Sequence, residues 1–171
     1  AIDAVLFLLK NDVKPERICW IMPRDSWILD RAQIQPTLES IGKTLASQII
    51  PGSQSDNIDD FFDKISEAGG LLRIDDNVKP TMYRCSTVTK AELEQLKRIK
   101  NIVRKRRVKT ISNTEIVLEN GSIATSSETL HIDCTGDGLA RRPPTPIFKA
   151  QKITLQSVRT CQQVFSAGLL G

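Results

Sequence analysis

The chain has 171 residues, of which 40% are hydrophobic and 26% are charged, a composition typical of a soluble globular protein. The formal net charge of +4 favours an anionic ligand without requiring nucleic acid. Four cysteines without a CxxC pair and a single histidine indicate neither a zinc site nor a dithiol redox motif, and they exclude a histidine-based metal cluster. No signal peptide and no apolar run long enough to cross a bilayer are visible, so we expect a cytoplasmic protein without membrane contact.

The first predicted elements are a helix and a strand. Apolar residues cover more than half of the helix surface over residues 1 to about 12, which predicts a largely buried helix. Residues 17–22 contain an unbroken apolar run, typical of a strand covered on both faces in a parallel sheet. Helix, short loop and buried strand form the second half of a βαβ unit, and its first strand would precede Ala1.

Residues 33–97 predict an inserted helical segment. Apolar spacings of three and four indicate a helix over 33–50, and a second helix over 55–68 has Ser55 or Asp56 as its expected N-cap. Residues 71–88 predict irregular structure or a short strand. A third helix starts at Thr89, which forms a capping-box pattern with Glu92.

The following part changes to β-forming residues. Residues 101–125 predict an antiparallel β-meander, because Asn120-Gly121 between β-formers is a strong hairpin signal. Residues 130–134 form a compact apolar run, which predicts another buried strand. The tail from about 160 to 170 predicts a helix.

Two places could contact a dinucleotide. Ala1 opens an apolar helix, as does the small sixth residue of a G-x-G-x-x-G/A turn. Arg24 follows the second strand of that unit, where an arginine suits the 2′-phosphate of NADP. The alternative is a surface arginine in a loop, with or without pairing to Asp25.

A third place is the turn after the run at 130–134. Thr135 and Gly136 offer small residues and free backbone amides at the carboxyl edge of that predicted strand, where α/β folds bind ligands. The alternative is an ordinary glycine-rich turn. No nucleophile–base pair is visible, as expected where cofactors carry the chemistry, so the catalytic residues stay unknown and no metal site is predicted.

Residues 97–109 hold eight basic side chains, which could form a nucleic-acid patch. Apolar residues interleave with these charges, and the segment has no aromatic side chain on which a base could stack. We therefore interpret it as a solvated helix end and strand start, and we predict no specific nucleic-acid binding.

A resemblance covers nearly the whole chain. VLENGS together with HIDCTGDGLARRP resembles the closing part of the NAD(P)-binding domain in two-dinucleotide-domain flavoproteins, with Cys134 in place of an alanine before Thr135-Gly136. The stretches AIDAVLFLLKNDVKPERICWIMPRDSWILDRAQIQP, GGLLRIDDNVKPTMYRCSTV and ITLQSVRTCQQVFSAGLL are similar to bacterial NAD(P)/FAD-dependent oxidoreductases.

The resemblance implies an α/β fold, namely a Rossmann-like NAD(P)-binding domain with a parallel core sheet, a β-meander and an inserted helical segment. Residues 1–171 would be a partial domain that passes hydride from NADPH to FAD, with FAD held by chain absent from this sequence. We expect the 171 residues alone to be inactive. We also expect them to associate or swap a segment through unpaired strand edges, or else to bind NADPH far more weakly than the intact protein. The alternative function is a non-enzymatic basic module that binds nucleic acid through residues 97–109.

Overall fold

The computed structural model describes residues 1–135, 143, 145–154 and 167–169. The chain divides into two compact units, residues 1–134 and 135–171, each of which is described by itself. The predicted helix over about 160–170 lies mostly outside the described residues.

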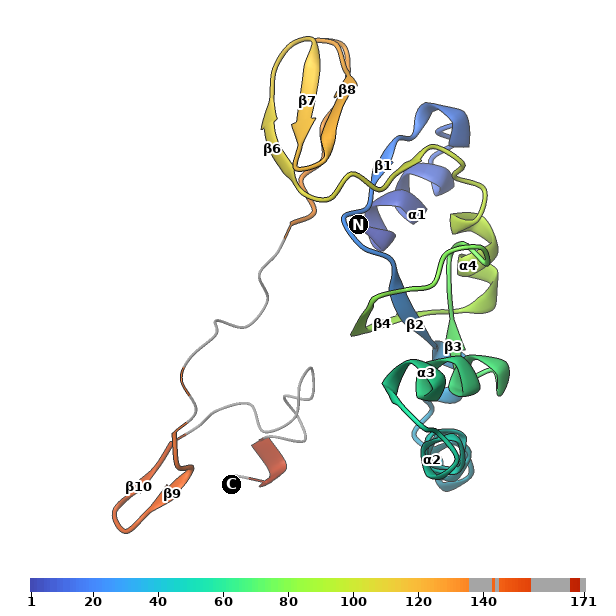
Figure 1. Cartoon of the computed structure of the whole chain (residues 1–171), viewed down its shortest axis with the longest axis vertical. Helices are drawn as coiled ribbons and strands as arrows, with labels where there is room; N and C mark the ends of the chain where they lie inside the picture. The colour runs from blue at the N-terminus through green and yellow to red at the C-terminus, as the bar shows by residue number, and fades with distance from the viewer. Residues whose placement is uncertain (136–142, 144, 155–166, 170–171) are drawn as a thin grey trace. The chain divides into compact units, whose positions relative to one another are not determined.

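The first unit alternates helices and strands (Figure 1). Its helices are α1 (Ile2–Lys10), α2 (Leu38–Ser53), α3 (Ile58–Glu67) and α4 (Lys90–Leu96), with short 3-10 turns at Pro15–Arg17 and Arg31–Gln33. Its strands are β1 (Trp20–Ile21), β2 (Ser26–Asp30), β3 (Leu71–Leu72), β4 (Met82–Val88), β5 (Ile102–Val103), β6 (Val108–Ile111), β7 (Glu115–Leu118) and β8 (Gly121–Ala124).

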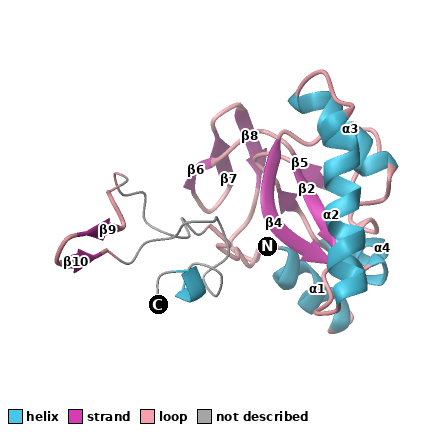
Figure 2. Ribbon diagram, turned by 90° about the horizontal axis from the view of Figure 1, so that it is seen from below, coloured by secondary structure: helices cyan, strands magenta, loops and turns pink. Residues whose placement is uncertain are grey.

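The strand β2 lies at the centre of a mixed sheet. It pairs in parallel with β4 and antiparallel with β3. Its side chains alternate between two buried clusters: Ile28 packs with residues of α1 and α4, whereas Trp27 packs with Ile65 of α3. Trp27 also stacks on Phe62 with ring centroids 5.9 Å apart. Helices therefore cover both faces of β2, and Figure 2 shows α3 beside this sheet.

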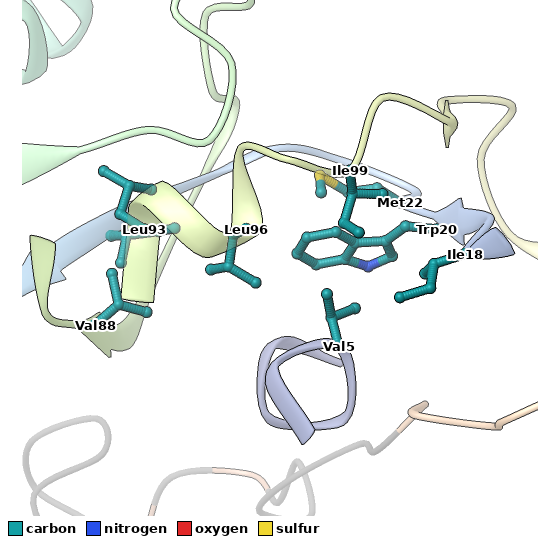
Figure 3. Close-up of a cluster of buried hydrophobic side chains, with 9 residues drawn as sticks. Val5, Ile18, Trp20, Met22, Val88, Leu93, Leu96 and Ile99 are labelled. Atoms are coloured by element: carbon teal, nitrogen blue, oxygen red, sulfur yellow. The ribbon is translucent and has the colours of Figure 1, made fainter. Parts of the chain in front are cut away.

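The strand β1 belongs to a separate parallel pair with β5. Trp20 donates its backbone N–H to Asn101 O (2.9 Å), and Met22 donates to Val103 O (3.0 Å). Figure 3 shows the Trp20 indole beside Val5, Leu96 and Ile99. Trp20 and Met22 are buried, whereas Ile21 is half-buried and Cys19, just before the strand, is exposed. The two faces are therefore not both fully covered as predicted.

The predicted fold class is wrong for the part of the chain that the structure describes. In place of a Rossmann-like parallel core sheet there are four small sheets: the β1–β5 pair, the mixed β3–β2–β4 sheet, the antiparallel β6–β7–β8 sheet, and a hairpin of β9 (Phe148–Lys149) and β10 (Lys152–Ile153) in the second unit. The physical reason is that residues 26–30 and 82–88 are strands that pair with each other. The segment 33–97 therefore contributes the strands β3 and β4 to the mixed sheet as well as forming helices.

Residues 130–134 also differ from the prediction, because they form no strand. Leu130 is 79% exposed and Ile132 is 49% exposed. A compact apolar run becomes a buried strand only when neighbouring strands and covering helices are present. Within the described residues, no strand pairs with it.

Helix α1 is less buried than predicted, since Val5 is its one buried residue and Phe7 is exposed.

The starts of helices α3 and α4 lie closer to their predicted positions, because local capping side chains define them. The capping box of α4 is confirmed, with Thr89 Oγ1 accepting from the Glu92 backbone N–H (3.1 Å) and Glu92 Oε2 accepting from the Thr89 backbone N–H (2.7 Å). The N-cap of α3 is Asn57, one residue beyond the predicted Asp56.

The meander has the predicted antiparallel order, with β7 between β6 and β8. Gly121 has a backbone φ of 111°, which suits glycine directly after the two-residue connection from Leu118. The meander strands therefore lie over residues 108–124, within the expected 101–125.

Candidate functional site

The candidate site lies at the carboxyl end of the β1–β5 pair and contains one of the predicted site residues, Arg24. The two strands are parallel, so their carboxyl ends meet at one edge. Arg24 comes just after β1, and its side chain is exposed. Arg104 directly follows Val103, the last residue of β5. Two guanidinium groups are thus carried by the segments that leave the same sheet edge.

Asp25 is held by Arg104. Asp25 is only 8% exposed, and its carboxylate accepts two hydrogen bonds from one guanidinium, from Arg104 Nε at 2.8 Å and from Arg104 Nη2 at 3.0 Å. Arg104 Nη2 also donates to Asp75 Oδ2 at 3.1 Å. This bidentate geometry is the strongest form of arginine–carboxylate pairing. The Asp25–Arg104–Asp75 cluster therefore fastens the segment after β1 to the segment after β5.

The two carboxylates of the cluster favour the charged form of Arg104. The hydrogen bonds to Asp25 raise the pKa of Arg104 above its already high ordinary value, and Asp75 adds to that rise. Arg104 consequently stays fully charged and is shared between two carboxylates. It does not present a free cation to a ligand.

Arg24 differs from Arg104 in this respect. In the part of the chain that the structure describes, Arg24 makes no ion pair. Asp25 does not pair with Arg24, because both carboxylate oxygens of Asp25 face Arg104, so the alternative of a surface arginine in a loop stays open without that pairing. Arg24 thus offers an exposed guanidinium beside a carboxylate that is already engaged.

The other predicted site residues are not brought to this edge. Ala1 is the exposed N-cap residue of α1 and makes no side-chain capping bond. Thr135 is exposed and belongs to the second unit, and Gly136 lies outside the described residues. The structure therefore tests the placement of Arg24 and leaves the proposed roles of the other three as predictions.

The basic segment 97–109 is partly committed to internal contacts. Lys97 pairs with Asp76 (3.1 Å), Arg98 donates to Gln95 Oε1 (2.6 Å), and Lys105 donates to Ser122 O (2.8 Å). With Arg104, half of the eight basic side chains are bound within the protein. The remaining four are exposed: Lys100, Arg106, Arg107 and Lys109.

A catalytic nucleophile is not apparent at this edge. Cys19 precedes β1 and has an exposed surface, yet partial withdrawal of its sulfur from water raises the pKa of the thiol, against a smaller opposite effect of Asn101. A raised pKa leaves less of the reactive thiolate at neutral pH. Among the described residues, no group of three His, Cys, Asp or Glu side chains could hold a metal ion.

Sequence reasoning missed Arg104 as the partner of Asp25, and it missed Asp75 as the second carboxylate that Arg104 binds. They lie 79 and 50 residues further along the chain, and no local motif links them. The available signal was the position of Arg104 at the end of an apolar pair, Ile102-Val103, inside an otherwise basic segment. That signal identifies a strand end but not its carboxylate partner.

The chain is similar to longer mycobacterial proteins. It is 51% identical over 175 residues to the uncharacterized protein Rv2000 of Mycobacterium tuberculosis and to the uncharacterized protein Mb2023 of Mycobacterium bovis. The match covers 98% of this chain and 32% of each relative, so the chain spans about a third of their length. No family model matches the chain, and no solved structure matches it.

A helix that crosses a membrane must be long and apolar. The described helices include none that is both long enough and apolar enough to cross a lipid bilayer.

Proposed function

We propose that this chain is part of a flavin-dependent oxidoreductase and that it recognises NADPH through Arg24. NADPH would supply the hydride, and FAD, held by chain outside these residues, would accept it. The proposal does not need a complete parallel core sheet. It needs the local arrangement at the carboxyl ends of β1 and β5.

The observation that supports the proposal is that Asp25 is bound by Arg104 whereas the neighbouring Arg24 is exposed. Dinucleotide sites that prefer NAD use a carboxylate at this place to bind the ribose 2′-hydroxyl, whereas an arginine accommodates a 2′-phosphate. Asp25 is engaged by Arg104, while Arg24 is exposed and has no ion-pair partner among the described residues. The arrangement therefore suits a phosphate better than a ribose diol.

The residues present fit one group of the cofactor. The planar guanidinium of Arg24 matches a 2′-phosphate in charge and in hydrogen-bond geometry. Nothing in the described residues bears on the flavin, and the glycine-rich turn expected before Ala1 is not part of this sequence. In this chain, Arg24 would bind the phosphate and Arg104 would keep Asp25 away from it.

Nucleic-acid binding through residues 97–109 has less support, because half of the basic side chains are bound internally. We place the protein in the cytoplasm as part of the same proposal. The free thiols of Cys19 and Cys134 fit a compartment that keeps cysteines reduced.

The test compares Arg24→Ala with Arg17→Ala in a flavin-loaded protein of the relatives' length that carries this chain. Arg17 is an exposed arginine before β1, so its removal changes the charge equally at the opposite end of the strand. NADPH and NADH are titrated separately. We expect Arg24→Ala to weaken NADPH binding about tenfold to a hundredfold, because a charge-assisted bond is lost, and to leave NADH binding unchanged.

Arg17→Ala should leave the affinities for both cofactors as they were. Equal small effects of Arg24→Ala on NADPH and NADH would overturn the assignment of Arg24. A parent protein that binds neither cofactor would overturn the proposed function itself.

A further inference from the structure

A second exposed arginine follows the sheet edge that carries Arg24. Arg24 comes three residues after Ile21, the last residue of β1. Arg106 comes three residues after Val103, the last residue of β5. The two strands are parallel, and Ile21 pairs with Val103. The chain therefore places both arginines the same number of residues beyond one edge of the β1–β5 pair.

The ion pair between Asp25 and Arg104 joins the two segments that carry these arginines. Arg104 donates to the Asp25 carboxylate at 2.8 Å and 3.0 Å. Asp25 is the residue after Arg24, and Arg104 stands two residues before Arg106. Because consecutive Cα atoms are about 3.8 Å apart, the Cα of Arg106 lies within about 8 Å of the Cα of Arg104. Both arginines are thus anchored next to a fixed ion pair.

The backbone of Arg106 lies in the left-handed region, with a φ of 63°. This conformation favours glycine, and another residue keeps it where the surrounding structure imposes it. The carbonyls on both sides of Arg106 are fixed: Lys105 O accepts from the Asn120 backbone N–H at 3.2 Å, and Arg107 O accepts from the Glu119 backbone N–H at 2.9 Å. An arginine where the backbone suits glycine indicates a role for its side chain.

Arg24 and Arg106 are both exposed, and neither makes an ion pair among the described residues. The acids closest to them along the joined segments, Asp25 and Asp75, are both bound by Arg104. Two guanidinium groups beside engaged carboxylates favour an anion that accepts several hydrogen bonds. A phosphate monoester has this chemistry, since it carries nearly two negative charges and three acceptor oxygens.

We propose that Arg24 and Arg106 together bind one phosphate monoester group at the carboxyl end of the β1–β5 pair. Arg24 donates from the segment after β1, and Arg106 donates from the segment after β5. Arg104 joins the two segments by holding Asp25. This inference deepens the proposed function and rests on it for the identity of the ligand, because the group bound there is the 2′-phosphate of NADPH.

The experiment titrates the 171-residue chain with adenosine 2′-monophosphate and, separately, with adenosine. NMR spectra follow the arginine Nε–H signals, which are assigned from their loss in Arg24→Ala and Arg106→Gly. We expect the Arg24 and Arg106 signals to shift with one common dissociation constant for adenosine 2′-monophosphate, and to stay in place with adenosine.

The variant Arg106→Gly separates phosphate binding from folding. Glycine suits the left-handed backbone at this position, so thermal unfolding should show a stability equal to or above that of the parent. Its matched control is Arg107→Ala, which removes the same charge from the next exposed residue. Arg106→Gly should weaken the binding of adenosine 2′-monophosphate about tenfold or more, because charge-assisted bonds are lost, whereas Arg107→Ala should weaken it less than about threefold.

Equal effects of Arg106→Gly and Arg107→Ala would overturn the proposal, because they would show a general attraction between charges. A parent chain that binds adenosine 2′-monophosphate no better than adenosine would overturn it as well. Failure of the proposed function has a different signature. In that case the protein of the relatives' length binds neither NADPH nor NADH, whatever the arginine signals show with adenosine 2′-monophosphate.

Discussion

At the scale of single residues, Asp25 shows how one long-range contact defines the candidate site. Asp25 follows Arg24 directly, and adjacency alone would suggest that the two side chains neutralise each other. The structure pairs Asp25 with Arg104 instead, through two hydrogen bonds on one guanidinium. Arg24 keeps its charge available because its neighbour is bound elsewhere.

Removing Arg104 should destabilise the protein. Arg104→Met leaves the nearly buried Asp25 carboxylate without its main partner, and breaking a fully buried pair costs roughly 3–5 kcal/mol. Since the Arg104 side chain keeps 31% exposure, we expect a smaller loss of about 2 kcal/mol in the free energy of unfolding. Urea denaturation measures this change.

The control for this variant is Arg98→Met. Arg98 is exposed and bonds only the amide oxygen of nearby Gln95, so its loss should change stability by no more than about 0.5 kcal/mol. A further change of Asp25→Asn in the Arg104→Met background should recover part of the lost stability, because the unpaired charge is removed. Equal effects of the Arg98 and Arg104 variants would show that the cluster contributes nothing specific.

At the scale of elements, helix α4 begins at a capping box formed by residues of its own first turn. Thr89 and Glu92 satisfy each other's backbone N–H groups, as the capping-box pattern predicts. The hydrogen bond that Glu92 accepts from the Thr89 backbone lowers the pKa of Glu92 below its ordinary value of 4.5. A lowered pKa in the folded state means that the ionised form of Glu92 favours folding.

This linkage gives a pH prediction for Glu92→Gln. The stabilisation from the Glu92 charge is complete above the unfolded-state pKa near 4.5 and is lost as the pH falls through the lower folded-state pKa. The parent should therefore be more stable than Glu92→Gln at neutral pH, and the difference should vanish in acid. Thermal unfolding across that pH range tests the expectation.

Glu94→Gln is the matched control, because Glu94 lies on the same helix and its side chain is 70% exposed. Its stability difference from the parent should stay small at every pH. A Glu92→Gln difference that stays constant down to strong acid would contradict the linkage.

At the scale of the whole molecule, the net charge is only +4, and half of the basic side chains in the segment 97–109 are bound within the protein. Four of the basic side chains in 97–109 are bound to acceptors within the protein, and Lys100, Arg106, Arg107 and Lys109 are left exposed. Binding to phosphates scales with the number of charges that can reach them. We therefore expect only loose, non-specific association with nucleic acid.

The measurement is fluorescence anisotropy of a labelled single strand and a labelled duplex near physiological salt. The dissociation constant should be weaker than about 1 μM for both, and it should weaken further as salt is added. Lys100→Ala with Arg106→Ala should lower the salt slope, because two available charges are removed. Tighter binding, or binding that depends on base sequence, would favour the nucleic-acid alternative.

The sequence by itself determined the features whose causes lie within a few residues. The capping box of α4 is one example, because Thr89 and Glu92 lie three positions apart and satisfy the local backbone. The meander turn is another, because Gly121 supplies a positive φ directly after the two-residue connection from Leu118. The carboxyl end of β1 was also visible, since an apolar run stops at Pro23 and Arg24. These features predicted where Arg24 would lie, but not what would surround it.

Only the tertiary structure decided which strands pair and which faces are covered. Residues 26–30 became the central strand β2 because residues 82–88 lie beside them, whereas no strand pairs with the apolar run at 130–134 among the described residues. The apolar side of α2 faces outward because Ser40 and Thr44, on its other side, bond a carbonyl outside the helix. In each case the deciding contact joins groups that the local pattern does not connect, so periodicity could indicate an apolar face without indicating whether anything covers it.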